Sequence, residues 1–329
     1  MRNHGLDAAK AVAAYFVILL HIRFPGRTGE ILNVLARFAV PFFFMVSGYF
    51  CYSRNGNMLS RMPGKIMHVL SLIAVSYPFY FVWQCMQRTI EGKDVEAWAS
   101  GLLEQEHILD FLKYNYSLVK YHLWFLPALL YCYLLFAAVE KLHLHKAAYL
   151  LIPVLLVLLF RMEAANITAK GTYRPRVYRN YLYTGFPFFM LGHLIHRMES
   201  AWKKRMSVWV PGELIILGAG MSIAEYWRAG VQELFVGSVF LAAGIFLASV
   251  KNPGKEVPKW LAEIGRRDAF FIYLFHLAIA DMWMDLVWYL GIETGSVYQW
   301  TRPFAVCILT TFGAVLMGKI RNLRKGSSL

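Results

Sequence analysis

Charged residues are scarce in this chain: they make up 16% of its 329 residues, whereas 58% are apolar. An ordinary soluble domain carries about 25% charged residues and lacks repeated apolar runs of about 20 residues. The composition therefore excludes a soluble domain. The alternating pattern of barrel strands is also missing. Because a backbone in lipid must satisfy its own hydrogen bonds, the apolar runs are expected to be helices.

Cysteine is scarce as well, and its four residues all lie in apolar runs without CxxC spacing. They are Cys51, Cys85, Cys132 and Cys307. This pattern argues against a disulfide framework. His143 and His145 have no cysteine or carboxylate nearby at ligand spacing, so we expect no metal site. A cleavable signal peptide, an internal repeat and a low-complexity tract are not evident, and we expect a single transmembrane domain over 1–329.

The apolar runs predict an all-α, polytopic membrane protein with about ten spanning helices, since a span needs roughly 20 apolar residues. The predicted spans are 6–24, 31–53, 65–87, 121–139, 147–160, 180–198, 212–228, 231–250, 269–290 and 300–320. The span at 147–160 is short, and its end is expected to continue into 161–165. The charged connections between these runs then give the topology.

The net charge is +14, and Lys and Arg gather in alternate connections between the runs. By the positive-inside rule, those connections and both termini face the cytoplasm. The connection 88–120 is acidic and is expected outside. The connection 161–179 is basic although it is predicted outside, with Lys170 and Arg174 among its cations. Either the topology changes there or this connection binds something anionic, and we favour binding.

Three ionisable residues lie in the first span: Asp7, Lys10 and His21. Such residues are costly in lipid and mark a functional site by default. Lys10 and His21 are eleven residues apart, so they project from one helix face about 16 Å apart along the axis. Asp7 lies one turn before Lys10 and can pair with it. The pair has an alternative interpretation as interfacial ions, and His21 as a buried structural residue. An imidazole that titrates near neutrality also suits proton abstraction from a hydroxyl.

The second span carries Arg37 in its outer third, where the cation needs a partner or a substrate. An aromatic run follows it, and small Ser47 and Gly48 then permit close approach of another helix. His122 and Trp124 open the span at 121–139. Arg179 and Asn180 open the span at 180–198, where they could orient a sugar or phosphate.

In order, these segments resemble the acyltransferase-3 family of integral membrane acyltransferases. The matching segments are Lys10 with His21 at Lys-x10-His spacing, Pro41–Phe44, Ser47–Gly48, Tyr121–Leu126, Phe186–Gly192 and Phe270–His276. The resemblance runs from the first predicted span to the region of the last. It implies transfer of an acyl group, usually acetyl from acetyl-CoA, to a hydroxyl of a sugar or similar envelope acceptor.

The resemblance also implies roles for particular residues. His21 would be the catalytic base, with Lys10 as its basic partner and Asp7 paired to Lys10. The family carries a basic Arg-x-x-Arg pair after the second span, for which this chain offers Arg61 and Lys65 at a wider spacing. Together with Lys10, these cations are expected to hold coenzyme A, which is a co-substrate and not a permanently bound cofactor.

The oxyanion formed in acyl transfer needs a hydrogen-bond donor, for which Ser47, the indole of Trp124 or an arginine are candidates. Arg37, His122, Arg179 and Asn180 are the further candidates for substrate binding. The sequence leaves open whether His21 acts as a base or forms an acyl-histidine.

We therefore expect a multi-pass O-acyltransferase of the cell membrane, and specifically of a bacterial plasma membrane. Its expected partners are acyl-CoA from the cytoplasm, an extracytoplasmic or lipid-linked glycan, and the lipid bilayer, and not nucleic acid. Many relatives fuse an extracytoplasmic esterase-like domain that this sequence lacks, so we expect the protein to act alone or with a separate envelope-biosynthesis partner protein. A transporter or flippase for a lipid-linked sugar is the alternative, since it would also use intramembrane charges. A non-catalytic scaffold is the third hypothesis.

Overall fold

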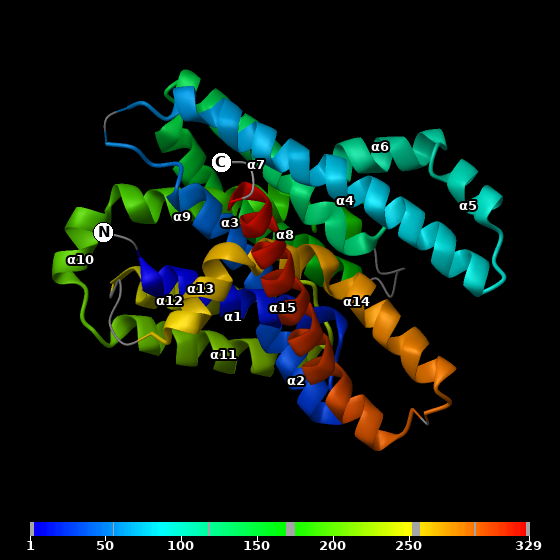
Figure 1. Ribbon diagram of the computed structural model, residues 1–329. Helices are drawn as coiled ribbons and strands as arrows, with labels where there is room; N and C mark the ends of the chain where they lie inside the picture. Colours follow the sequence, from blue (N-terminus) through cyan, green and yellow to red (C-terminus); the bar gives the residue numbers. More distant parts are fainter. Residues whose placement is uncertain are drawn as a thin grey trace. The chain divides into compact units, whose positions relative to one another are not determined.

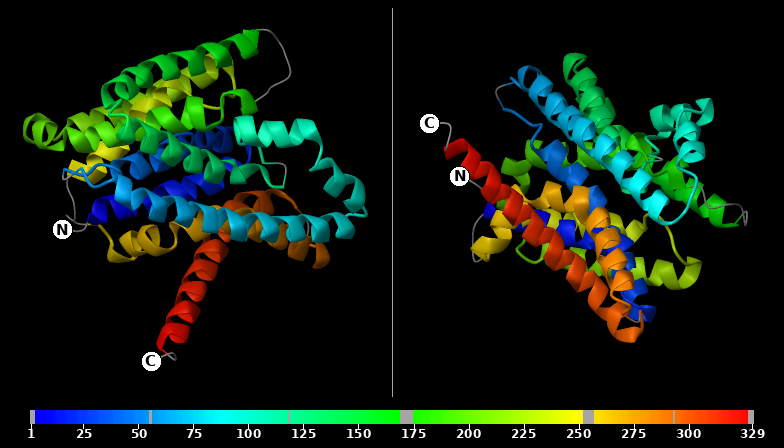
Figure 2. Two further views of the ribbon diagram at one scale, coloured as in Figure 1. Left: turned by 90° about the horizontal axis from the view of Figure 1, so that it is seen from above. Right: turned by 45° about the vertical axis from the view of Figure 1, so that its right-hand side comes forward.

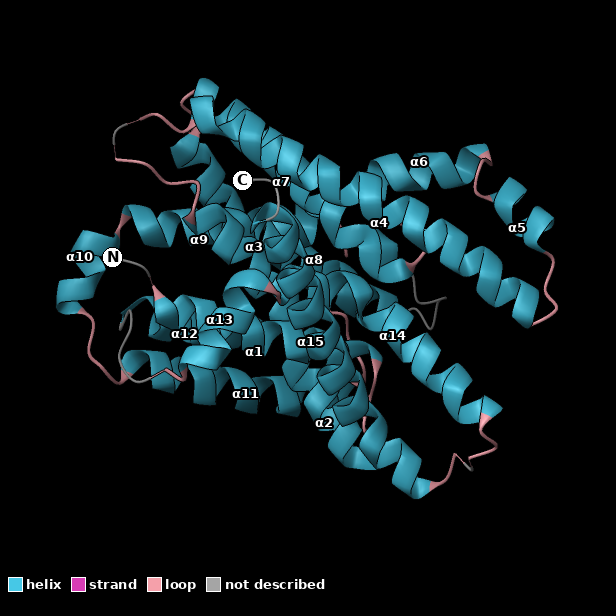
Figure 3. Ribbon diagram, viewed as in Figure 1, coloured by secondary structure: helices cyan, strands magenta, loops and turns pink. Residues whose placement is uncertain are grey.

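The fold is helical throughout the part of the chain that the structure describes. The computed structural model describes residues 3–54, 56–117, 119–168, 175–251, 257–292 and 294–326. Within these ranges every regular element is a helix and none is a strand, as Figure 3 shows. This confirms the all-α class predicted from the apolar runs.

Long helices make up most of the chain, and short helical turns interrupt them at a few points (Figure 1). The longer helices are α1 (His4–His21), α2 (Gly26–Ala36), α3 (Ala39–Tyr49), α4 (Met62–Ile90), α6 (Gln105–Tyr114), α7 (Phe125–Lys141), α8 (His145–Thr168), α9 (Phe186–Arg197), α11 (Val210–Ala229), α12 (Val236–Lys251), α13 (Lys259–Arg267), α14 (Ala269–Tyr289) and α15 (Ser296–Gly326). The shorter ones are η1 (Leu59–Arg61), α5 (Val95–Gly101), η2 (Tyr121–Trp124), η3 (Pro175–Val177), η4 (Tyr181–Gly185) and α10 (Glu199–Arg205).

Six helical segments of the described chain are long and apolar enough to cross a membrane, or seven if a bent pair counts as one span. They are Gly26–Tyr49, Leu59–Ile90, Tyr121–Lys141, His145–Ala165, Ala269–Tyr289 and Ser296–Ile320, and the bent pair is α10 with α11. The expected continuation of the span at 147–160 into 161–165 is confirmed. Ten spans and cytoplasmic termini stay predictions.

The chain divides into two compact units. The first unit comprises Met1–Phe43 and Arg205–Leu329, and α1 is its central helix, packed against α2, α12, α13, α14 and α15. α1 and α13 approach closely because α13 carries Gly265: a Cβ built on this glycine would lie 1.7 Å from the backbone oxygen of Asp7. The small residue therefore lets α13 lie directly on the turn of α1 that carries its charged residues.

The second unit, Phe44–Lys204, contains α4 to α9 (Figure 2). Within it, the end of α3 crosses α9 at two glycines. A Cβ on Gly48 would lie 1.8 Å from the Phe189 backbone oxygen, and a Cβ on Gly192 would lie 2.0 Å from that of Met45. Two of the segments that carry the family resemblance thus pack against each other here, which confirms that Gly48 permits a close helix approach.

Candidate functional site

His21 occupies the last position of α1, and its ring stacks on that of His276 from α14. The ring centroids are 5.3 Å apart and the ring planes differ by 21°. His276 is fully buried, and its Nδ1 lies 2.8 Å and 3.1 Å from the backbone oxygens of Tyr273 and Ile272. Because a carbonyl oxygen only accepts, Nδ1 of His276 must carry a proton. In the neutral ring, Nε2 is then an acceptor.

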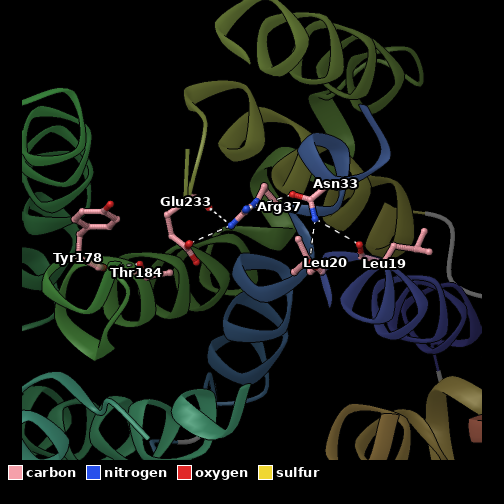
Figure 4. A network of polar contacts seen from close by, with 7 residues as sticks. All are labelled: Leu19, Leu20, Asn33, Arg37, Tyr178, Thr184 and Glu233. Atoms are coloured by element: carbon pink, nitrogen blue, oxygen red, sulfur yellow. Dashed lines mark hydrogen bonds and ion pairs between the residues drawn. The ribbon is translucent and has the colours of Figure 1, made fainter. Parts of the chain in front are cut away.

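Asn33 of α2 holds the end of α1 in place, as Figure 4 shows. Its side-chain nitrogen donates to the backbone oxygens of Leu20 at 3.0 Å and Leu19 at 3.4 Å. These are among the last carbonyls of α1, which have no partner within the helix. Asn33 is 4% exposed, so this buried amide fixes the turn from which His21 projects.

Arg37 lies one turn after Asn33 and finds its partner in the same unit. Its Nη1 lies 3.1 Å from the carboxylate and 3.3 Å from the backbone oxygen of Glu233, and its Nη2 donates to the side-chain oxygen of Asn33 at 3.3 Å (Figure 4). The two charged side chains are 12% and 15% exposed. Arg37 is therefore neutralised by Glu233, and it is coupled through Asn33 to the end of α1.

At the other end of α1, Lys10 and Asp7 form the predicted ion pair, with 2.7 Å between Nζ and Oδ1. The Lys10 and Asp7 side chains are 19% and 12% exposed. α13 lies over this turn through Gly265. On the exposed side of α13, hydrogen bonds from Arg266 and then Arg267 hold the pKa of Glu263 below its usual value.

Two of the three predicted coenzyme-binding cations, Arg61 and Lys65, lie in the second unit, at the start of α4. Arg61 is exposed, and Lys65 follows one turn later, with its Nζ 5.7 Å from the ring centroid of Tyr133. Ser47 hydrogen-bonds to the same tyrosine. The fold thus brings Lys65 and Ser47 to one side chain, Tyr133, which the sequence did not single out.

Trp124 and His122 are buried in the second unit, with 7% and 2% of their surfaces exposed. The Arg179 guanidinium carbon lies 5.9 Å from the ring centroid of Trp124, a cation–π contact. His122 meets the Tyr80 ring edge to face at 5.0 Å.

Asn180, 2% exposed, builds the turn that follows Arg179. Its side-chain oxygen accepts hydrogen bonds from the backbone of Leu182 and Tyr183, and its nitrogen donates to the backbone oxygen of Val177 at 2.8 Å. Thr184 closes the same turn by donating to the backbone oxygen of Tyr178 at 2.8 Å (Figure 4). Asn180 therefore shapes the backbone turn that follows Arg179.

The basic connection 161–179 is partly neutralised within the unit. Arg176 forms an ion pair with the buried carboxylate of Asp110 and lies 6.0 Å from the ring centroid of Tyr116. Lys170 and Arg174 lie outside the described residues. Arg179, by contrast, is a cation of this connection whose guanidinium contacts the ring of Trp124.

The sequence-predicted residues divide between the two units. Asp7, Lys10, His21 and Arg37 belong to the first. The second contains Ser47, Arg61, Lys65, His122, Trp124, Arg179 and Asn180. Within the first unit, the ion pair and the histidine mark opposite ends of one helix, as the spacing predicted.

Sequence reasoning missed Asn33 and Glu233 as members of the site. One signal was present: Asn33 and Arg37 are polar residues four apart, which places them on one helix face. The partner Glu233 lies far along the chain and has no local signature. The argument that His145 lacks a nearby carboxylate was wrong, because the turn between α7 and α8 brings the Glu140 carboxylate to 2.8 Å from its Nε2.

Several described helices that are long and apolar enough to cross a membrane place the chain among helical multi-pass membrane proteins. The family model for an acyltransferase domain matches residues 3–319. The chain therefore belongs to the acyltransferase-3 family, as its motif order predicted.

One curated relative is similar over part of the chain. A protein from Enterococcus gallinarum named serine/alanine racemase is 30% identical over 142 residues, which are 40% of this chain and 18% of that protein. The match thus spans less than a fifth of the relative's length. No solved structure matches the chain.

Proposed function

We propose that this protein is a membrane O-acyltransferase that moves an acyl group, by preference acetyl, from acyl-CoA to a hydroxyl of a sugar or other cell-envelope acceptor. The observation that carries the proposal is the His21–His276 pair at the end of α1, in a chain that matches the family over nearly its whole length. An imidazole held at a fixed helix end is suited to general-base catalysis.

In the proposed reaction, His21 takes the proton of the acceptor hydroxyl while its oxygen attacks the thioester carbonyl. The new bond joins the acyl carbon to the acceptor oxygen, and the bond from that carbon to sulfur then breaks. The proton passes from His21 to the departing coenzyme A thiolate. Atoms and charge balance without a further reactant, and the products are an ester and free coenzyme A.

His276 and Asn33 are the proposed positioning residues for this step. The backbone acceptors of His276 fix its tautomer, so its ring presents a defined face to His21. Asn33 fixes the backbone turn beneath His21. Holding the base in one orientation lowers the barrier because less ordering is needed in the transition state.

The donor is proposed to bind through cations. Lys10, held by Asp7, and the pair Arg61 and Lys65 are suited to the phosphates of coenzyme A. Ser47, near Lys65 through Tyr133, is the proposed donor to the oxyanion, with the indole of Trp124 as the second candidate.

The acceptor is proposed to contact Arg179 with its aromatic neighbours Trp124 and His122, since an arginine over an aromatic ring suits a sugar or phosphate. Arg37 is the other acceptor candidate, and Asn180 shapes the turn. The proposed location is a bacterial plasma membrane, where acyl-CoA is available from the cytoplasm and a glycan acceptor is lipid-linked or extracytoplasmic.

A thiol-release assay tests the proposal. The full chain in nanodiscs receives acetyl-CoA with and without a crude envelope-glycan extract, and free coenzyme A is measured. The expected result is thiol release that depends on the extract and disappears in His21→Ala. If wild type binds acetyl-CoA but releases no thiol with any extract, and His21→Ala behaves identically, catalysis by this site is ruled out.

A transporter or flippase for a lipid-linked sugar or related envelope precursor is the second candidate. The ion pairs Asp7–Lys10 and Arg37–Glu233 favour it, because a transporter also uses charges buried among membrane helices. It predicts uptake of a labelled substrate into proteoliposomes without a covalent change, and tolerance of His21→Gln, which retains hydrogen bonding.

A further inference from the structure

The second unit contains its own histidine cluster, which the proposed acyl transfer does not use. Glu140 lies in the last turn of α7, His145 begins α8, and His193 lies in α9. Each offers one ligand atom, and these three atoms lie within 4.8 Å of one another. Two imidazoles and a carboxylate form a ligand set typical of zinc.

The turn between α7 and α8 builds one half of the cluster. Three residues separate the helices, and His143 among them adopts a positive φ of 57°, which reverses the chain. Glu140 and His145 therefore face each other, with 2.8 Å between Oε2 and Nε2. By itself this contact could simply close the helical hairpin.

His193, the third residue of the cluster, lies in α9 and does not help to close the α7–α8 hairpin. The ring of His193 stacks on that of His145, with 5.6 Å between centroids and 18° between planes. Phe136 packs against both rings, at 5.0 Å from His193 and 6.4 Å from His145. His193 is 2% exposed, so a buried imidazole is brought to a hairpin that already holds an imidazole and a carboxylate.

A second layer of contacts orients His193. Its Nδ1 lies 2.8 Å from the hydroxyl of Tyr149, which is also 3.5 Å from Arg197 Nη1. A histidine whose Nδ1 is hydrogen-bonded can present Nε2 to a metal. Metal-ligating histidines usually have a hydrogen-bond partner on the ring nitrogen that does not bind the metal. Arg197 contacts the phenol and not the ligand atoms, while the Glu140 carboxylate supplies the negative charge that a dication needs.

We propose that Glu140, His145 and His193 bind a divalent transition-metal ion of the zinc type, which ties the α7–α8 hairpin to α9. Ligand bonds of 2.0–2.1 Å in a tetrahedral site place the ligand atoms about 3.3 Å apart. The Glu140 and His145 ligand atoms, 2.8 Å apart, need to separate by about 0.5 Å. The widest pair in the cluster, which lies within 4.8 Å, needs to close by at most about 1.5 Å, through side-chain rotation. The fourth position is open to water. An anion fits less well, since the Glu140 carboxylate would repel it.

The test is Co²⁺ titration of the full chain in nanodiscs, purified without a histidine tag and stripped with EDTA. Co²⁺ in a tetrahedral site absorbs visible light, so binding is read independently of any enzymatic activity. The expected result is one Co²⁺ per chain, displaced by Zn²⁺, with affinity weakened at least about tenfold by Tyr149→Phe and more by His145→Gln, His193→Gln or Glu140→Gln. The matched control is His143→Gln, which changes an exposed histidine of the same turn and is expected to bind as wild type.

Thermal melting supplies a second readout. Zn²⁺ is expected to raise the melting temperature of wild type and of His143→Gln, because an ion that binds only the folded state stabilises it. It is expected to have little effect on the ligand variants. The proposal is overturned if wild type takes up no Co²⁺ at one equivalent, or if the ligand variants bind as wild type does. Should a ligand variant not fold, the wild-type titration and Tyr149→Phe decide.

Discussion

Each unit contains a stacked pair of histidines, and the pairs differ in what holds them. In the first unit, His276 donates to backbone carbonyls of its own helix and stacks on His21 at 5.3 Å. In the second, His145 meets a carboxylate and His193 a phenol, and the rings stack at 5.6 Å. The ring geometry is nearly the same, so the neighbours decide the chemistry.

A carbonyl partner fixes the tautomer of a neutral imidazole and supplies no charge, which suits a pair that handles a proton. A carboxylate and a phenol provide a negative ligand and an outer hydrogen-bond partner, which suits a cation. Two similar histidine pairs thus acquire different proposed roles from the groups that contact each ring.

The largest effect is expected for His21→Ala. Removal of a general base lowers kcat by at least about 100-fold, as measured by acceptor-dependent thiol release. Co²⁺ binding should be unchanged, since the cluster in the second unit is intact. Retention of more than about a tenth of wild-type kcat would contradict the role of His21.

Substitution of the contact glycines tests the packing beneath each pair. Gly265→Ala in the first unit and Gly192→Ala in the second place a Cβ about 2 Å or less from a backbone oxygen, and each should destabilise its unit by about 1–3 kcal/mol. Thermal melting in nanodiscs measures the effect.

The matched controls are Gly220→Ala and Gly64→Ala, where an added Cβ meets nothing within 4 Å. These helical positions should gain up to about 1 kcal/mol of stability from the better helix former. Equal melting temperatures for all four variants would mean that the close helix approaches do not support the fold.

His276→Phe tests whether the ring partner of His21 acts through its nitrogen atoms. Phenylalanine retains an aromatic face and removes the nitrogen atoms, and thermal melting of the variant reports whether the larger ring disturbs the packing. We expect kcat to fall about tenfold, or about 1.4 kcal/mol of barrier, with a shifted pH–rate profile and an unchanged KM. An unaltered pH–rate profile would make His276 a packing residue only.

The smallest effect is expected for Lys65→Met, which keeps the aliphatic stem beside Tyr133 and removes the charge. Loss of a phosphate contact of about 1 kcal/mol raises KM for acyl-CoA about fivefold, with kcat preserved. Salt should reduce the difference from wild type, since it screens charges. Lys146→Met, at the exposed start of α8, is the control with no expected change. Equal KM values of Lys65→Met and Lys146→Met for acyl-CoA would contradict the proposal that Lys65 binds the donor.

Much of the fold could be predicted because lipid leaves few choices. Apolar runs predicted the helices, and the eleven-residue spacing of Lys10 and His21 placed them on one face of α1. The ion pair of Asp7 with Lys10 was also predictable, since residues one turn apart meet on a helix. Small Gly48 predicted a close crossing, although its partner α9 was not identified.

The rest depends on contacts between segments far apart in the chain. Glu233, the partner of Arg37, and Tyr133, which Ser47 and Lys65 share, have no local pattern that marks them. Asn180 reads in sequence as a polar residue available to substrate, whereas its amide satisfies the backbone of its own turn. Local spacing cannot report which hydrogen bonds a fold has already used.

The sequence by itself determined the helical class, the family and the residues of α1 that carry charge, because helix periodicity and the cost of charge in lipid act locally. The tertiary structure decided which histidines meet. His276 lies 255 residues from His21, and His193 lies 48 residues from His145. Only the packing of α14 on α1 and of α9 by the α7–α8 hairpin brings these rings together, because side-chain contacts between helices depend on crossing geometry that no local pattern encodes.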